Sequence, residues 1–248
     1  MRVVTFGEVM LRLAPQNHLR ISQSVPGILE STFGGGELNV AVSIALQGGA
    51  SAFVTASPDN AITDSLVQEV KKTGVDSSLI QRSSRGRFGI YFVETGANQR
   101  GGTVTYDRGF SSIALATPDE FDWNQVFEEA TWFHITGITP AISESGAALA
   151  LKAMQEAQAR KVPVSCDLNF RKKLWNWKSG TKPVELAKET MRSLVPYVDV
   201  VIANEEDADL SLGIRAPESD VDAGELNVQG YIAVAEQITQ QFPNVKQG

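Results

Sequence analysis

The chain has 248 residues, of which 42% are hydrophobic and 21% charged, and it contains one cysteine. This composition is typical of a globular chain that buries a sizeable core, and it excludes disordered and fibrous classes. The formal net charge is −7 with no basic stripe, which argues against a nucleic-acid partner. No apolar run reaches the roughly 20 residues that a membrane helix needs. Because the start shows no signal-peptide pattern and one cysteine cannot form an internal disulfide, we expect a cytoplasmic protein with no membrane partner.

In chain order, short apolar runs alternate with helical patterns. The runs predict strands over 3–6, 52–55, 132–135, 162–166 and 198–202. The helical patterns cover 38–46, 61–73, 143–160, 184–194, 205–212 and 229–241. Because continuous apolar strands suit a sheet that is covered on both faces, this order predicts an α/β fold with a mostly parallel sheet. Residues 242–248 follow the last helix, at the place where a further strand is expected to begin.

Two segments interrupt this order. Residues 19–33 show no helical period, and residues 88–94 and 103–108 alternate around a glycine-rich turn, which predicts an antiparallel hairpin. We expect segments 10–33 and 88–110 to form a small sheet that projects from the α/β body, as a lid or as a contact between copies of the chain. The alternative is a meander that only extends the edge of the main sheet.

Several catalytic motifs are missing from the sequence. It has no Gly-x-Gly-x-x-Gly after the first strand, no P-loop and no Gly-x-Ser-x-Gly, which excludes the corresponding dinucleotide, nucleotide and hydrolase signatures. His18 and His134 lack the spacing of zinc ligands. We expect His134 and Cys166 to be buried core residues rather than catalytic groups.

A run of three glycines is the first candidate binding feature. Gly34, Gly35 and Gly36 precede a predicted helix. Glycine lets a ligand approach the backbone closely, and the start of a helix offers N–H groups to an acid or a hydroxyl. The alternative is a tight turn into the helix.

Polar side chains form the other candidates. Tyr91, Tyr106 and Arg108 lie on the predicted hairpin, where tyrosines can contact a small polar ligand and a guanidinium suits a carboxylate or phosphate. Asn169 and Arg171 follow the fourth strand, at the carboxyl end where ligands of parallel sheets bind. Residues 204–207 follow the fifth strand with oxygen donors that suit Mg²⁺ or its bound water. The alternatives are structural: alternation on a two-faced strand, and acidic residues that favour the start of a helix.

These motifs occur in the order of one family. The chain resembles the ribokinase-like (PfkB) carbohydrate kinases and, among them, the 2-keto-3-deoxygluconate kinases. The resemblance extends over essentially the whole chain and implies a three-layer α/β/α fold with a small β-sheet lid. It is carried by 7–12 (Gly-Glu-Val-Met-Leu-Arg), 34–41, Tyr91, 106–108 (Tyr-Asp-Arg), 167–171, 174–175 and 204–206.

The resemblance implies ATP-dependent phosphorylation of 2-keto-3-deoxygluconate, a sugar acid, on its 6-hydroxyl, with ATP and Mg²⁺ as cofactors. It assigns Asn169, Arg171 and Asn204 to ATP. It assigns Glu206 and Asp207 to Mg²⁺, indirectly. The residues that it assigns to the sugar acid are Gly34, Gly35, Gly36, Glu37, Leu38, Tyr91, Tyr106, Arg108 and Arg171.

The pair of arginines favours an acid over a neutral sugar. A charge-assisted hydrogen bond to a carboxylate contributes roughly 1.5–3 kcal/mol, and a neutral sugar would leave the charges of Arg108 and Arg171 unmatched. Another kinase of the family, similar to fructokinase or ribokinase, is the second interpretation.

The sequence departs from the family pattern in two places. Asp207 stands where the family's Asn-x-x-Glu motif has glutamate. The family's Gly-Ala-Gly-Asp segment, whose aspartate is the base, does not occur in the sequence. We therefore expect 1–248 to be a kinase domain that lacks its C-terminal part, with the catalytic base beyond Gly248. One such electrostatic group alone is typically worth ~10²–10³ in kcat. A third interpretation is therefore an inactive chain that binds a sugar acid.

Overall fold

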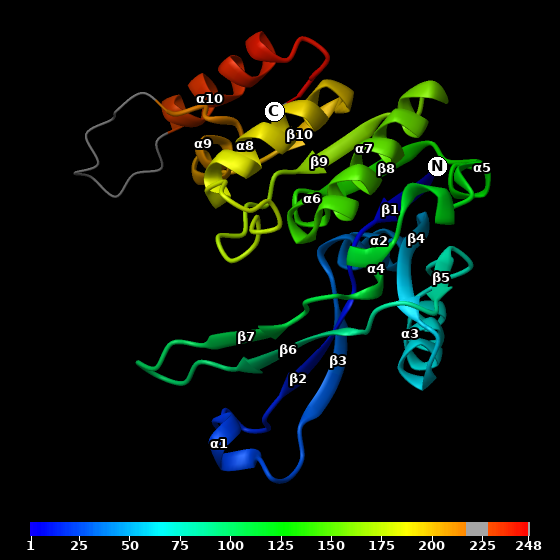
Figure 1. Cartoon of the computed structure of the whole chain (residues 1–248), viewed down its shortest axis with the longest axis vertical. Coiled ribbons are helices and arrows are strands. Elements are labelled where there is room, and N and C mark those ends of the chain that lie inside the picture. The colour runs from blue at the N-terminus through cyan, green and yellow to red at the C-terminus, as the bar shows by residue number, and fades with distance from the viewer. Residues whose placement is uncertain (217–227, 248) are drawn as a thin grey trace.

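The computed structural model describes residues 1–216 and 228–247 and contains two β-sheets (Figure 1). All strand pairs of the larger sheet are parallel, and the strand order is β10-β9-β8-β1-β4-β5. Its strands are β1 (Arg2–Phe6), β4 (Ala50–Pro58), β5 (Ile80–Ser83), β8 (Trp132–Thr136), β9 (Val164–Asp167) and β10 (Val200–Ile202). The predicted α/β fold with a parallel sheet is confirmed.

Helices cover this sheet on both sides, as the alternation of strands and helices predicted (Figure 1). The longer ones are α2 (Gly36–Leu46), α3 (Ala61–Lys72), α7 (Glu144–Ala159), α8 (Pro183–Leu194), α9 (Glu205–Leu212) and α10 (Val228–Gln241). The shorter ones are α1 (Ile21–Ser24), α4 (Ser112–Leu115), α5 (Trp123–Val126), α6 (Ile138–Ile142) and the 3₁₀ turns Pro118–Glu120 and Val195–Tyr197. In the part of the chain that is described, no helix is long and apolar enough to cross a membrane.

Neighbouring residues of β4 show how the sheet divides the core. Val54 belongs to a cluster with Leu149 of α7, whereas Phe53 belongs to a separate cluster with Leu66 of α3. Successive side chains of a strand point to opposite faces, so the two clusters lie on opposite faces of the sheet. The structure therefore has three layers.

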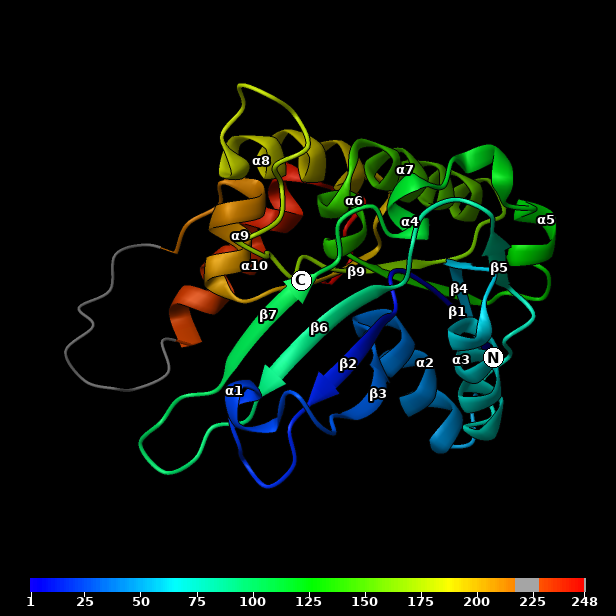
Figure 2. The same ribbon diagram turned by 60° about the horizontal axis from the view of Figure 1, so that its bottom comes forward.

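The smaller sheet, which we call the lid, extends away from the main sheet (Figure 2). Its strand order is β3-β2-β6-β7, with β3 (Glu30–Gly34), β2 (Met10–Ala14), β6 (Gly89–Glu94) and β7 (Thr103–Asp107). The β6–β7 hairpin is antiparallel as predicted, and β2 pairs with β6 in parallel. Because these strands form a sheet of their own, the alternative of a meander on the edge of the main sheet is wrong.

The chain after α10 runs beside the edge strand β10. The Val201 N–H donates to the Gln247 carbonyl oxygen at 3.0 Å, and the Lys246 N–H donates to the Asp199 carbonyl oxygen at 2.8 Å. These bonds accompany an isolated parallel bridge between Val200 and Gln247. Pairing thus begins where the sequence pattern predicted the start of a further strand.

Gly248 follows this bridge directly and lies outside the described residues. The catalytic base is expected beyond Gly248. The described part, 1–216 and 228–247, therefore does not test where the base lies, and its location beyond Gly248 stays a prediction.

Candidate active site

A cavity of about 620 Å³ lies between the lid and the loop that follows β9. Tyr106 and Arg108, at the end of β7, line it from the lid, and Arg171 lines it from the loop. The two arginines are 63 positions apart in sequence (171 − 108), and the fold brings them to one cavity. Both carry guanidinium groups that suit a carboxylate or a phosphate, so the cavity can receive an anion.

Arg108 is held in place by a buried carboxylate. Its guanidinium forms an ion pair with Glu8, and the two side chains are 12% and 1% exposed. The guanidinium also lies over the Tyr106 ring, 5.5 Å from the ring centroid. Nε of Arg108 and Oε1 of Glu8 are buried without a hydrogen-bond partner. Buried polar atoms normally have a partner, so these two atoms are exceptions in the structure.

The two lid tyrosines and the first glycine lie together. The rings of Tyr91 and Tyr106 are 5.9 Å apart between centroids and 31° from parallel. A Cβ on Gly34 would lie 2.4 Å from the Tyr91 hydroxyl oxygen, so only glycine leaves room for that hydroxyl. Burial raises the pKa of Tyr91 above its ordinary value. Tyr91 contacts Tyr106, which lines the cavity, without lining it directly.

The side chains of Glu37 and Leu38 point into the protein. The carboxyl of Glu37 accepts a hydrogen bond from the Thr136 hydroxyl at 2.6 Å, and burial raises its pKa to about 7. A Cβ on Gly7 would lie 2.2 Å from Cδ of Glu37, so glycine at position 7 makes space for this carboxyl. Leu38 packs in the core with Phe53. Any contact of 34–38 with a ligand would therefore come from the backbone at the start of α2.

The residues expected to face ATP lie at the ends of β9 and β10. The Asn169 N–H donates to Oδ1 of Asp167 at 3.1 Å, and Asn169 has a left-handed φ of 39°. Oδ1 of Asn204 accepts the Asp207 N–H at 2.7 Å and thereby caps α9. Burial, and then the charge of Asp207, raise the pKa of Asp167.

Asp207 joins the two strand ends. Its Oδ1 accepts the Phe170 N–H at 2.9 Å, and Phe170 precedes Arg171 in the loop. The hydrogen bond therefore links the first turn of α9 to the loop that carries Arg171.

No group of three or more His, Cys, Asp or Glu residues that could hold a metal occurs in 1–216 or 228–247. The indirect role of Glu206 and Asp207 toward Mg²⁺ stays a prediction.

The two residues expected in the core are there. Nδ1 of His134 lies 2.9 Å from the Ser165 hydroxyl, and burial lowers the pKa of His134 to about 4. Cys166 is fully buried, and burial raises the pKa of its thiol. A neutral imidazole and a protonated thiol inside the sheet support structural roles for both.

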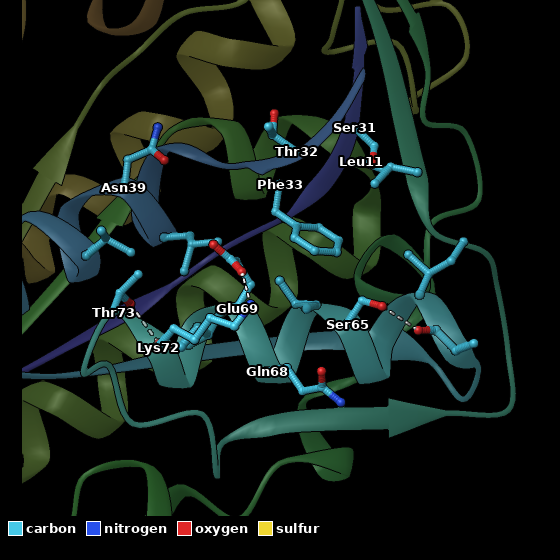
Figure 3. A pocket seen from close by; sticks show the side chains of 16 residues that line it. Leu11, Ser31, Thr32, Phe33, Asn39, Ser65, Gln68, Glu69, Lys72 and Thr73 are labelled. Carbon is cyan, nitrogen blue, oxygen red and sulfur yellow. Dashed lines mark hydrogen bonds and ion pairs between the residues drawn. The ribbon is translucent and has the colours of Figure 1, made fainter. Parts of the chain in front are cut away.

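A second cavity, of about 780 Å³, lies on the other side of the lid, between β2, β3, α2 and α3 (Figure 3). Some of its polar side chains bond within α3: the Ser65 hydroxyl donates to the Ala61 carbonyl oxygen, and Lys72 pairs with Glu69. Phe33 points into it from the lid. Of the residues that the sequence assigned to a ligand, only Leu38 lines this cavity, so its size alone does not make it a candidate for chemistry.

The sequence did not reveal several features of the smaller cavity. Glu8 lies 100 positions from Arg108, and a pairing over that distance leaves no local pattern. Lys172 and Lys173 also line the cavity, and the sequence pattern did not single them out as candidates. Phe110 lines it as well, with a φ of 57° and 77% exposure. Positive φ in a bulky residue depends on surrounding contacts and has no signature in one sequence.

Comparison with known proteins places the chain in a family. The pfkB family carbohydrate kinase pattern matches residues 1–239. The chain belongs to the pfkB family of carbohydrate kinases. A crystal structure of 2-dehydro-3-deoxygluconokinase from Thermotoga maritima shares 40% sequence identity and superposes with a TM-score of 0.87, covering 98% of this chain and 69% of that one.

Two curated proteins are also similar to this chain. A 2-dehydro-3-deoxygalactonokinase from Haloferax volcanii is 34% identical over 83% of this chain and 61% of its own length. A 2-dehydro-3-deoxygluconokinase from Thermoproteus tenax is 28% identical over 76% of this chain and 55% of its own length. The matched part of the chain thus spans less than two thirds of either relative.

Proposed function

We propose that this pfkB chain serves the ATP-dependent phosphorylation of 2-keto-3-deoxygluconate on its 6-hydroxyl. The observation that carries the proposal is that Arg108 and Arg171 line one cavity. Two guanidinium groups in a partly enclosed space favour a carboxylate ligand, because each can donate charge-assisted hydrogen bonds. The ion pair with Glu8 already matches part of the charge of Arg108, so a neutral sugar would leave mainly Arg171 unmatched. The relatives named for 2-dehydro-3-deoxy sugar acids support the same substrate class.

In this proposal the lid and the loop after β9 bind different parts of the sugar acid. Arg108 and Arg171 bind the carboxylate, while the hydroxyls of Tyr91 and Tyr106 and the backbone of 34–38 orient the rest of the sugar acid. Asp207 holds the loop through the Phe170 N–H.

The strand ends bind the phosphate donor. Asn169, Arg171 and Asn204 contact ATP, and Glu206 and Asp207 bind Mg²⁺ through water. When bound, ATP supplies the phosphoryl group. Phosphoryl transfer depends mainly on positioning and on charge stabilisation, which are tasks that these side chains can perform. We also propose that the outer face of the lid, the one opposite Tyr91 and Tyr106, contacts a second copy of the chain.

The experiment is a calorimetric titration of the chain with 2-keto-3-deoxygluconate and with D-fructose. We expect the acid to bind more tightly, and Arg108→Ala or Arg171→Ala to weaken acid binding by about 10- to 100-fold, with little effect on fructose. Arg82→Ala is the control, because Arg82 is paired with Asp59 and Asp64 and does not line the cavity. Equal effects on both sugars would contradict the carboxylate assignment and favour a fructokinase-like or ribokinase-like substrate.

A coupled assay of ATP consumption distinguishes an active kinase from a chain that binds the sugar acid without phosphorylating it. Acid binding without turnover would favour a chain that binds the sugar acid but does not phosphorylate it. Clear turnover by the 248-residue chain would contradict the expectation that the catalytic base lies beyond Gly248.

A further inference from the structure

The cavity between the lid and the β9 loop has an apolar part as well as a basic part. Beside Arg108 and Arg171, it is lined by hydrophobic side chains from the lid, from α6 and from the loop. These are Val104, Phe110, Ile142, Phe170 and Leu174. A fully hydroxylated sugar acid would bring a hydroxyl on C3 against such a wall. A 3-deoxy sugar acid would bring a methylene group there instead.

Phe110 stands out among these residues. It is 77% exposed and has a left-handed φ of 57°, a region that bulky side chains rarely occupy. Its backbone is held by neighbours: the Arg87 N–H donates to the Phe110 carbonyl oxygen at 3.1 Å, and the Ser112 N–H donates to the Arg87 carbonyl oxygen at 3.0 Å. The ring is therefore presented at the cavity by a fixed backbone rather than by packing in the core. Unusual backbone conformations of this kind concentrate at ligand sites.

Phe110 lies close in sequence to Arg108, the residue proposed to bind the carboxylate of the sugar acid. It follows Arg108 by two residues, and both line the same cavity. In a 2-keto-3-deoxy acid the deoxygenated carbon, C3, follows the carboxylate carbon by two bonds. A ligand whose carboxylate is bound at Arg108 therefore keeps its methylene group close to Arg108, in the cavity that Phe110 also lines.

We infer that Phe110 is a specificity-determining residue that covers the C3 methylene of the bound sugar acid; this inference rests on the proposed function. Contact between ring and methylene removes apolar surface of both from water. A hydroxyl on C3 that faces the Phe110 ring would lose its water on that side without gaining a partner from the ring, because the ring is hydrocarbon. The cavity thus discriminates between 3-deoxy acids and their hydroxylated analogues.

The test compares two acids that differ at C3. The full chain is titrated calorimetrically with 2-keto-3-deoxygluconate and with 2-ketogluconate, which has the same carboxylate and ketone but carries a 3-hydroxyl. We expect the chain to bind the deoxy acid about tenfold more tightly. Phe110→Ala should reduce this ratio to about threefold or less, mainly by weakening the deoxy acid, and Phe110→Leu should restore most of it.

The matched control is Arg108→Ala, which should weaken both acids by the same factor and leave their ratio unchanged. Because Phe110 is largely exposed, its variants should keep the melting temperature of the parent chain. If the parent chain binds both acids equally, or if Phe110→Ala leaves the ratio unchanged, this inference is wrong and the sugar-acid function stands. If neither acid binds, the proposed function itself fails.

Discussion

Arg108 combines a predictable and an unpredictable property. Its place after Tyr106 on an alternating run is visible in the sequence, and that pattern sufficed to propose an anion-binding side chain. Its ion pair with Glu8 is not visible, since the two residues are 100 positions apart. Glu8 neutralises part of the charge and fixes the guanidinium, so the arginine meets a ligand in one orientation. Preorganised groups of this kind lose less entropy on binding.

Glu37 gives a prediction about pH. Burial raises its pKa from an ordinary 4.5 to about 7, so the folded chain holds a proton that the unfolded chain has already released between these values. Stability should therefore fall as pH rises from about 4.5 to 7, by on the order of 3 kcal/mol, and then level off. Glu37→Gln, which can still accept the Thr136 hydrogen bond, should remove this fall. Urea denaturation at pH 5 and pH 8 measures the change in the free energy of unfolding.

Glu128→Gln is the control for that measurement, because Glu128 is exposed. Its pH dependence should match that of the parent chain. A Glu37→Gln chain that loses as much stability between pH 5 and pH 8 as the parent would show that Glu37 does not titrate in this range.

At the scale of elements, five of the six strands of the main sheet and its longer helices follow the sequence pattern because their periodicity is local, whereas the edge strand β5 was not predicted. Asn60 caps α3 with hydrogen bonds to the Ile62 and Thr63 N–H groups, and Gly213 ends α9 with a left-handed φ of 73°, as such residues commonly do. The parallel pairing of β2 with β6 could not be predicted, because about 75 residues separate the two strands and no turn fixes their register.

The link between α9 and the β9 loop provides a second prediction. Asp207→Ala removes the acceptor for the Phe170 N–H and frees the loop that carries Arg171. Affinity for the sugar acid, measured without ATP, should fall by about tenfold, which corresponds to one hydrogen bond to a charged group. Asp207→Asn keeps an acceptor oxygen and should retain most of the affinity.

Glu205→Ala, in the same first turn of α9, is the matched control and should bind as the parent does. Unchanged affinity in Asp207→Ala would mean that the loop keeps its position without this hydrogen bond. Equal losses in Asp207→Ala and Asp207→Asn would assign the effect to the charge of the carboxylate.

For the whole molecule, the two faces of the lid lead to a prediction about assembly. Ser31, Leu13, Phe92 and Thr105 are aligned across the four strands on the face opposite Tyr91 and Tyr106. This row contains two large hydrophobic residues that are only partly buried. We expect the chain to form a dimer through this outer face, because such apolar surface is usually covered.

Light scattering coupled to size exclusion measures the dimer. Ser31→Arg places a charge on the outer face and should yield monomers, since a buried unpaired charge is strongly unfavourable. Thr32→Arg is the control: it is exposed on the same strand but on the opposite face, and it should leave the dimer intact. A parent chain that is monomeric at all concentrations would contradict the prediction.

The pairing of Glu8 with Arg108 also has a mechanical consequence. Glu8 lies between β1 and β2, and Arg108 directly follows β7, so both residues are at the base of the lid. If the lid tilts about its base, its far end near Glu94 and Thr103 moves the furthest. Residues at the base, next to the axis of the tilt, move the least. The carboxylate of a sugar acid bound to Arg108 could therefore stay bound while the lid moves. The rest of the sugar would become covered or uncovered as the lid closes or opens.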